Sequence, residues 1–158
     1  MNWYWIALLI FVTFIFMDFV AWFTHKYVMH GFLWILHKDH HTRENKIFEW
    51  NDLFALMFAI PAVILMITGS ISGIDIKFYI GAGIALYGLA YFIFHDLIIH
   101  QRIRFFRNAN NFYLRSIISA HENHHRGRKN YGFLIFFQWK YFNPENHKAF
   151  YSRKYANH

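Results

Sequence analysis

The sequence predicts an all-α integral membrane protein with about three transmembrane helices and a histidine-rich site for two metal ions at one membrane face. Hydrophobic residues make up 56% of the 158 residues and charged residues only 16%, whereas soluble domains carry roughly 25% charged residues. Three long stretches are almost free of charge, and ten of the twelve histidines lie outside or at the ends of these stretches, in two copies of one spacing pattern. The length predicts a single membrane-embedded domain over residues 1–158.

The first span is predicted over residues 3–23, an apolar run that only Asp18 interrupts. A run of this length can cross a hydrocarbon core of about 30 Å as a helix. No Lys or Arg precedes it, so a retained helix is favoured over a cleavable signal peptide. Because a carboxylate is costly in lipid, we expect Asp18 to be hydrogen-bonded between helices or to support the metal site.

The second and third spans are predicted over residues 53–73 and 78–97, with a short turn over residues 70–77 around their junction. Pro61 lies inside the second span, where neighbouring helices can satisfy the backbone group that it frees. The third span contains three glycines that either permit close helix packing or are incidental, since glycine is common in such helices: Gly81, Gly83 and Gly88.

The remainder of the chain, residues 101–158, is basic and rich in aromatic residues. Its two apolar patches, residues 112–120 and 131–142, are too short to cross a bilayer as helices. We therefore predict that they are interfacial or re-entrant segments. A fourth span, built from this region or by splitting the third span, is the alternative.

The distribution of positive charge predicts the orientation in the membrane. All Lys and Arg residues except Lys77 lie in residues 24–52 and 95–158, which three spans place on the same side. By the positive-inside rule this side is the cytoplasmic face of the cell membrane. We attribute the net charge of +7 to orientation, to membrane lipid contact and to docking of an acidic electron donor, and we expect no nucleic acid partner.

The histidines follow the pattern H-x4-H and then H-x2-H-H twice, in the same order. The first copy comprises His25, His30, His37, His40 and His41, and the second comprises His95, His100, His121, His124 and His125. Neutral imidazole is a common ligand of transition metals, and ten imidazoles exceed the needs of one ion. Two metal ions are therefore expected.

The spacing within the first copy leaves one question open. On an α-helix, His37, His40 and His41 share one face, whereas two residues five apart, such as His25 and His30, point about 140° apart. Either the helix breaks near Gly31, or His25 and His30 serve different metals.

Several kinds of metal chemistry are excluded or disfavoured by the sequence. The chain has no cysteine, which excludes disulfides, zinc ribbons, iron–sulfur clusters and thiolate-ligated haem. Bis-histidine haem needs single histidines on facing helices at membrane depth, whereas these histidines cluster at helix ends. A zinc metalloprotease remains a distant alternative, because residues 121–125 read H-E-N-H-H and satisfy the H-E-x-x-H pattern. That motif leaves most of the clustered histidines unused, and Lys38 stands where the first copy would need the glutamate.

A non-haem di-iron centre that activates O2 for an apolar substrate is the favoured interpretation, because nitrogen-rich ligation suits iron. Four segments carry a resemblance to a known family: HKYVMHG at residues 25–31, FEWNDL at 48–53, HDLIIHQR at 95–102 and AHENHH at 120–125. Together they resemble the bacterial β-carotene 3-hydroxylases of the fatty acid hydroxylase and sterol desaturase superfamily. The resemblance covers nearly the whole chain and includes all ten clustered histidines.

The resemblance implies a monooxygenase in which the ten histidines bind two iron ions and O2 is the co-substrate. It would hydroxylate C3 of the β-ionone rings of a carotenoid substrate in the bilayer, converting β-carotene to β-cryptoxanthin and then to zeaxanthin. Ketolated rings would lead to astaxanthin. Electrons would come from ferredoxin and its NAD(P)H-dependent ferredoxin reductase. A fatty acid or sterol hydroxylase or desaturase of the same superfamily is the alternative.

No catalytic residue is expected beyond the metal ligands. Asp96 follows His95 directly and Asp39 precedes His40, so either carboxylate could accept an imidazole N–H and fix the tautomer of a ligand. The alternative for both is a helix-end or surface carboxylate. The many aromatic residues are expected to line both the lipid contacts and a hydrophobic slot for the substrate.

Overall fold

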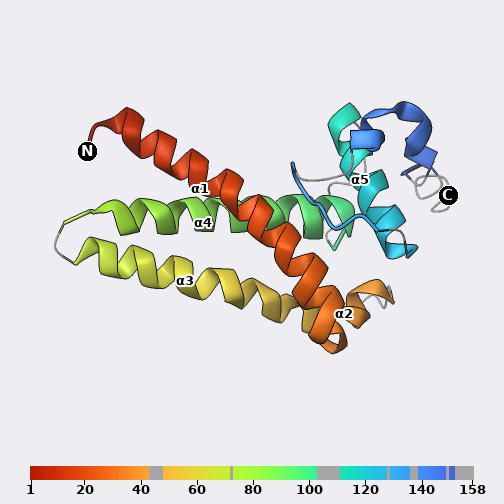
Figure 1. The fold of residues 1–158 in the computed structure, drawn as a ribbon, viewed down its shortest axis with the longest axis horizontal. Helices are drawn as coiled ribbons and strands as arrows, with labels where there is room; N and C mark the ends of the chain where they lie inside the picture. Colours follow the sequence, from red (N-terminus) through yellow and green to blue (C-terminus); the bar gives the residue numbers. More distant parts are fainter. Residues whose placement is uncertain are drawn as a thin grey trace.

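The protein is a bundle of three long helices that carries a helical cap at one end (Figure 1). The computed structural model describes residues 1–42, 48–71, 73–102, 111–127, 129–135, 139–148 and 150–151. In chain order the elements are α1 (Trp3–Phe23), η1 (Thr24–Phe32), α2 (Trp34–His41), η2 (Trp50–Asp52), α3 (Leu53–Ser70), α4 (Ile76–Tyr91), η3 (Phe92–Ile99), α5 (Phe112–His125), η5 (Trp139–Phe142) and η6 (Pro144–His147).

Three helical stretches are long and apolar enough to cross a membrane: Trp3–Phe32, Trp50–Ser70 and Ile76–Ile99. Large apolar side chains cover their outer surface, with Phe11 62% and Ile67 58% exposed. Such a surface is stable in lipid and not in water. The prediction of three spans is confirmed: α1 has the predicted bounds, α3 ends three residues early at Ser70, and the third span is longer than predicted. No fourth candidate span occurs among the described residues.

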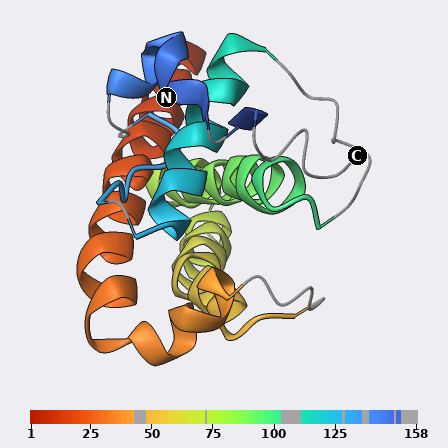
Figure 2. The same cartoon turned by 90° about the vertical axis from the view of Figure 1, so that its right-hand side faces the viewer.

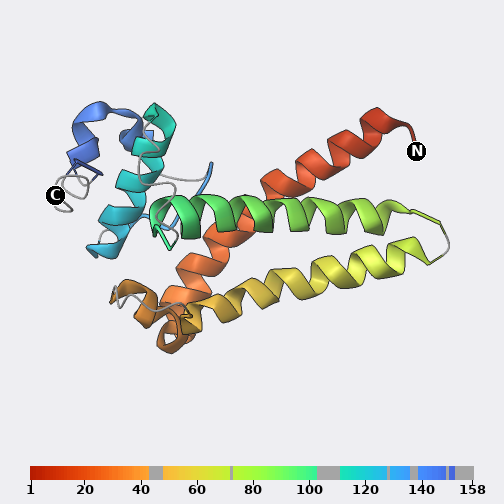
Figure 3. The same ribbon diagram turned by 180° about the vertical axis from the view of Figure 1, so that it is seen from behind.

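The topology brings the two histidine-bearing regions to one end of the bundle. Helices α3 and α4 form an antiparallel hairpin, and α1 crosses α4 (Figure 1). The hairpin turn lies at the same end as the N-terminus, whereas α2 and α5 lie at the opposite end, as the reverse view also shows (Figure 3). Figure 2 looks onto this opposite end, where α5 lies across the ends of the spans.

Two of the three glycines in α4 permit close helix contacts. A Cβ atom on Gly81 would lie 2.7 Å from the carbonyl oxygen of Ala62 in α3, and one on Gly83 would lie 2.7 Å from Cβ of Thr13 in α1. A Cβ on Gly88 would have no neighbour within 4 Å. The packing interpretation therefore holds for Gly81 and Gly83, and Gly88 is incidental.

Replacing Gly81 with Ala is expected to lower the free energy of unfolding by about 1–3 kcal/mol, because the added methyl group forces the backbone of α3 away. Replacing Gly88 with Ala is the matched control and should leave stability unchanged or raise it by up to about 1 kcal/mol. Thermal unfolding of the purified variants in detergent micelles checks this. Equal stability of the two variants would contradict close packing at Gly81.

The segments η1 and η3 are π-helical, and they settle the question that the H-x4-H spacing raised. In a π-helix the hydrogen bonds join residues five apart, as in the bond from His100 N–H to the carbonyl of His95 at 2.8 Å. Residues five apart then lie above one another, so the members of each H-x4-H pair share a face. A break near Gly31 is also present, with φ −101° and ψ −123°. It follows the first pair and turns the chain into α2.

Helix α5 positions the last three histidines. The side chain of Asn111 caps its first turn by accepting a hydrogen bond from Leu114 N–H at 2.8 Å, and Gly127, with φ 81°, ends it just after His125. The apolar patch 112–120 forms its first part and is largely buried, in one apolar core with Met17 of α1 and Tyr87 of α4. Of the second patch, residues 136–138 lie outside the described residues, and residues 131–135 form a non-helical segment.

Candidate metal centre

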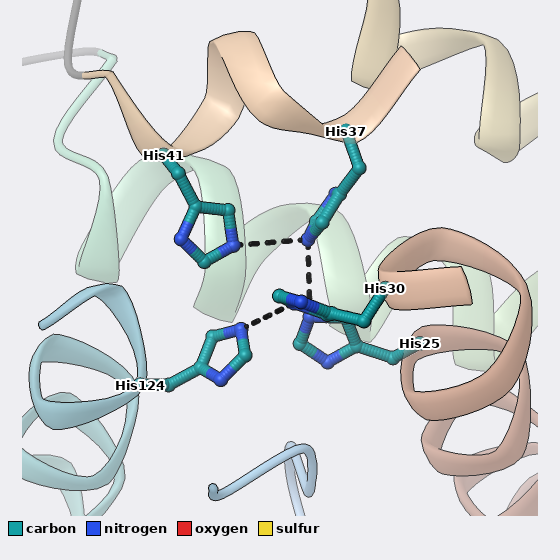
Figure 4. Close-up of side chains that lie close together, drawn as sticks. All are labelled: His25, His30, His37, His41 and His124. Carbon is teal, nitrogen blue, oxygen red and sulfur yellow. Dashed lines mark hydrogen bonds between the residues drawn. The ribbon is translucent and has the colours of Figure 1, made fainter. Parts of the chain in front are cut away.

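The first histidine cluster combines side chains from η1, α2 and α5. The potential ligand atoms of its members all lie within 4.8 Å of one another (Figure 4): His25, His30, His37, His41 and His124. Nε2 of His37 is 3.2 Å from Nε2 of both His25 and His41. Nε2 of His30 is 2.9 Å from Nε2 of His124.

The second cluster combines side chains from α2, η3 and α5. His40, His95, His100 and His121 have potential ligand atoms within 4.8 Å of one another. His125 adjoins them, because its Nε2 lies 2.8 Å from Nε2 of His121, which is also 2.9 Å from Nε2 of His100. All ten histidines singled out in the sequence are thus brought together in two groups of five.

Each cluster contains one histidine from the other copy of the sequence pattern. The middle residues of the two H-x2-H-H groups cross over: His124 joins the first cluster and His40 joins the second. Helix geometry explains this, because a rotation of about 100° per residue places His40 about 60° to one side of His37 and His41 about 40° to the other. The sequence predicted one shared face, and the structure divides that face between two sites.

The two clusters are immediate neighbours. The imidazole rings of His41 and His125, one from each cluster, are stacked with their centroids 4.4 Å apart. The rings of His37 and His40 have centroids 5.3 Å apart. Two metal ions bound in these clusters would therefore be adjacent.

The first cluster has the donor geometry of a metal site. With metal–nitrogen bonds of about 2.1 Å, two ligands at right angles stand about 3.0 Å apart, close to the observed separations. The Nδ1–H groups of His25 and His37 donate to the carbonyl oxygen of Tyr131 at 3.0 Å and to Oδ1 of Asn51 at 2.6 Å. Since a neutral imidazole has only one N–H, the Nε2 atoms of His25 and His37 face each other with lone pairs. A cation between them would accept both lone pairs and remove their repulsion.

In the second cluster, a nitrogen atom without a hydrogen-bond partner also indicates a metal site. Nδ1 of His40 lies 2.8 Å from Oε2 of Glu49, to which it donates. Nε2 of His40 is buried and has no hydrogen-bond partner among the described residues. Because a buried acceptor without a partner costs free energy, a metal ion that takes this lone pair would stabilise the site. The residues present therefore fit a metal at both clusters.

The electrostatics of the clusters keep the histidines in the form that can bind metal. Burial lowers the pKa of His37 to about 3, although the hydrogen bond to Asn51 opposes the shift, and burial lowers the pKa of His41 to about 4. Burial, together with the neighbouring imidazoles, also lowers the pKa of His40 and of His121 well below the usual value. These imidazoles are neutral at pH 7, as metal ligation requires.

Arg102 organises the carboxylates beside the second cluster. Its guanidinium makes two hydrogen bonds to Asp52, at 2.7 and 3.1 Å, and lies 3.2 Å from Oε2 of Glu49 and 3.1 Å from Oδ1 of Asp96. Burial alone would lower the pKa of Arg102, but these carboxylates outweigh it and raise the pKa. Arg102 thereby holds Glu49 in place as the acceptor for His40.

The two aspartates named from the sequence differ in their placement. Oδ1 of Asp96 is 3.5 Å from Nδ1 of His95, which is long for a hydrogen bond, and its closer partner is Arg102. Asp39 instead accepts hydrogen bonds from the backbone N–H groups of His40 and Trp50, at 2.9 and 2.7 Å. Its side chain links α2 to η2 and does not orient an imidazole.

Sequence reasoning missed Glu49 and Asn51, the acceptors that orient the imidazoles of His40 and His37. Both lie in the FEWNDL segment at residues 48–53, which had been singled out only for its resemblance. Its concentration of polar side chains directly before an apolar span was the available signal.

The H-E-x-x-H interpretation does not account for the site. His121 and His125 do lie in one cluster, as that motif requires, but three more imidazoles lie beside them. A catalytic zinc site has three protein ligands and keeps a position for water. The motif also leaves the whole first cluster unexplained.

Comparison with known proteins agrees with this description. The fatty acid hydroxylase family model matches residues 10–143. The β-carotene hydroxylase of Pantoea ananas is 42% identical over 139 residues, covering 85% of this chain and 79% of that protein. The β-carotene hydroxylase of Pseudescherichia vulneris is 41% identical over 133 residues, covering 81% and 75%.

A plant protein is similar over part of its length. The chloroplastic β-carotene hydroxylase 2 of Capsicum annuum is 37% identical over 125 residues, covering 75% of this chain and 41% of that protein. No solved structure matches the chain. Because the family model and the bacterial relatives cover most of its length, the chain belongs to the fatty acid hydroxylase family.

Proposed function

We propose that the protein is a carotenoid hydroxylase that inserts one oxygen atom of O2 at C3 of β-ionone rings. Its substrates would be β-carotene, converted through β-cryptoxanthin to zeaxanthin, and ketolated rings on the route to astaxanthin. One observation carries the proposal: two adjacent all-imidazole clusters lie at the end of three apolar spans, in a chain 42% identical to a β-carotene hydroxylase.

The ten clustered histidines would hold two iron ions. Iron suits nitrogen ligands, and when bound it would supply the redox chemistry that activates O2. Converting a C–H group and O2 to C–OH and water consumes two electrons and two protons. Because the chain contains no cysteine to hold an iron–sulfur cluster of its own, we assign the electron supply to a reduced ferredoxin and its reductase.

The role of the remaining residues is to orient the ligands, to exclude water and to place the substrate. The ring of Tyr131 lies 5.1 Å from that of His30, and the ring of Phe133 lies 5.1 Å from that of His95. Trp34 lies 5.2 Å from His30 and from His41. These rings give both clusters an apolar cover against which a hydrocarbon ring can pack.

The excess of Lys and Arg on the histidine side favours a cytoplasmic location of the site in the cell membrane.

Pigment analysis of a bacterium that accumulates β-carotene and expresses this chain tests the proposal. Zeaxanthin should appear with the chain and not with the empty vector. If β-carotene persists while the purified protein contains about two irons, the substrate is instead a fatty acid or a sterol. Zinc as the only bound metal, without oxygenation of any lipid, would overturn the proposal.

A further inference from the structure

Asp18 is a fully buried carboxylate in the middle of the first span. It is 0% exposed, and it accepts hydrogen bonds from donors in two other parts of the described chain. The Tyr87 hydroxyl donates at 2.9 Å, Leu134 N–H at 3.2 Å and Ile135 N–H at 2.8 Å. The helix–helix hydrogen bond expected from the sequence is present in the contact with Tyr87. The donors of Leu134 and Ile135, in contrast, belong to a segment more than 100 residues away in the chain.

This segment, residues 131–135, is called the strap below. It is non-helical, and it reaches the level of Asp18 in the first span. Asp18 precedes His25 by seven residues, so it lies about 10 Å deeper in the span than His25, measured along the helix axis. Non-helical backbone is tolerated at membrane depth only where the protein satisfies its polar groups. Asp18 satisfies two N–H groups of the strap, which explains why a carboxylate lies within an apolar span.

The other end of the strap contacts the metal centre. The carbonyl oxygen of Tyr131 accepts the hydrogen bond from Nδ1 of His25 at 3.0 Å. The ring of Phe133 packs 5.1 Å from His95 and 4.6 Å from Tyr91. Five consecutive residues therefore run from a ligand of the first cluster, past the second, to the carboxylate of Asp18.

We propose that Asp18 is a positioning residue for the metal centre, acting on His25 through the strap; this rests on the metal binding proposed above. The bonds to Leu134 and Ile135 fix the strap, and the fixed carbonyl of Tyr131 sets the tautomer and the ring orientation of His25. Without Asp18 the strap N–H groups lose their acceptor, the carbonyl of Tyr131 shifts, and Nε2 of His25 is no longer aimed at the first cluster. Such outer partners govern metal affinity in other histidine sites.

Metal titration of the Asp18→Asn variant tests the proposal. The amide keeps the size of the side chain and one acceptor oxygen, but its NH2 group replaces the other oxygen and faces the N–H of either Leu134 or Ile135. In apo protein titrated with Co²⁺, one of two sites should bind roughly tenfold more weakly, while the other site and the helix content stay unchanged. Wild-type affinity at both sites would overturn the proposal. A wild-type protein that binds no Co²⁺ would contradict the metal centre itself, a separate result.

A double-mutant cycle identifies the affected site. The effect of Asp18→Asn should disappear in a His25→Ala background, because the residue through which it acts is gone, and should persist in a His95→Ala background. The Glu49→Ala variant is the control for the other site, since it removes the acceptor of His40 and should weaken the second cluster. Equal effects of Asp18→Asn in both histidine backgrounds would contradict action through His25.

If the Asp18 variant does not fold, hydrogen exchange of the wild-type protein tests whether the strap and the metal centre are coupled. Because coupling between two sites is reciprocal, metal binding at His25 must also stabilise the strap. Loading apo protein with Zn²⁺ should slow exchange of the amides of Leu134 and Ile135. Exchange that is unchanged by Zn²⁺ would show that the strap and the metal centre are independent.

Discussion

Replacing His121 with Ala abolishes hydroxylation and removes a metal ion from the second cluster; this is the expected result with the largest effect. Nε2 of His121 is the common neighbour of His100 and His125, at 2.9 and 2.8 Å, and the residue is only 4% exposed. Its loss removes a ligand, and no water or other side chain at a buried position can readily replace it. We expect no zeaxanthin in the carotene-accumulating host, and reduced iron content in the purified variant.

His147 provides a matched control for His121. It is also buried, at 1% exposure, but lies outside both clusters and donates from Nε2 to the carbonyl oxygen of Tyr141 at 2.7 Å. His147→Ala should lower stability by about 1–3 kcal/mol through the lost hydrogen bond, yet retain metal and activity. Zeaxanthin formation by the His121→Ala variant would exclude that residue as an essential ligand.

Replacing His40 with Ala should remove metal from the cluster built mainly by the second sequence copy, although His40 belongs to the first. The structure places His40 with His95, His100 and His121. We expect the affinity of that cluster for Co²⁺ to fall by more than about tenfold, since a ligand is lost and outer partners alone are worth that much.

Double-mutant cycles measured by Co²⁺ titration check this assignment. Substitutions that remove ligands of the same ion are expected to be more strongly coupled than substitutions in the two adjacent sites. His40→Ala should therefore be more strongly coupled to His100→Ala than to His25→Ala. His41→Ala, one residue along the same helix, is the control and should show the reverse couplings. If His40 and His41 couple to the same partners, each cluster is assembled from a single copy and the crossover is absent.

The spans could be predicted because composition and length alone determine them. An apolar run as long as residues 3–23, with Asp18 as its one charged residue, has few alternatives to a membrane helix, and α1 has those bounds. The ends were less certain, because the third span continues through η3 into the metal centre. The ten histidines were likewise visible in the sequence as a set, since their spacing repeats.

The grouping of these histidines depends on features that leave no periodic signal. A π-helix differs from an α-helix in which carbonyl accepts each hydrogen bond, and the apolar pattern of the span does not record that choice. The crossover of His40 and His124 depends on how α2 and α5 face each other. The acceptors Glu49 and Asn51 contact their histidines from a separate segment, η2 and the residue before it.

The partners of Asp18 could also be predicted only in part. Its position in an apolar run predicted that it must have polar partners, and it does. The sequence could not predict the backbone N–H groups of Leu134 and Ile135 as partners. A backbone donor carries no sequence signature, and these two lie far away in the chain.

The wide turns of η1 and η3 also bear on how such sites arise and how they are recognised. Relative to an α-helix, each π-turn amounts to the insertion of one residue, and the insertion aligns two imidazoles at the end of a lipid-spanning helix. In a regular α-helix the same spacing would point the two imidazoles of each pair about 140° apart, so each π-turn is what lets both reach one cluster. The mark left in the sequence is four residues between the histidines, and a genome search restricted to α-helical spacings would pass over both pairs.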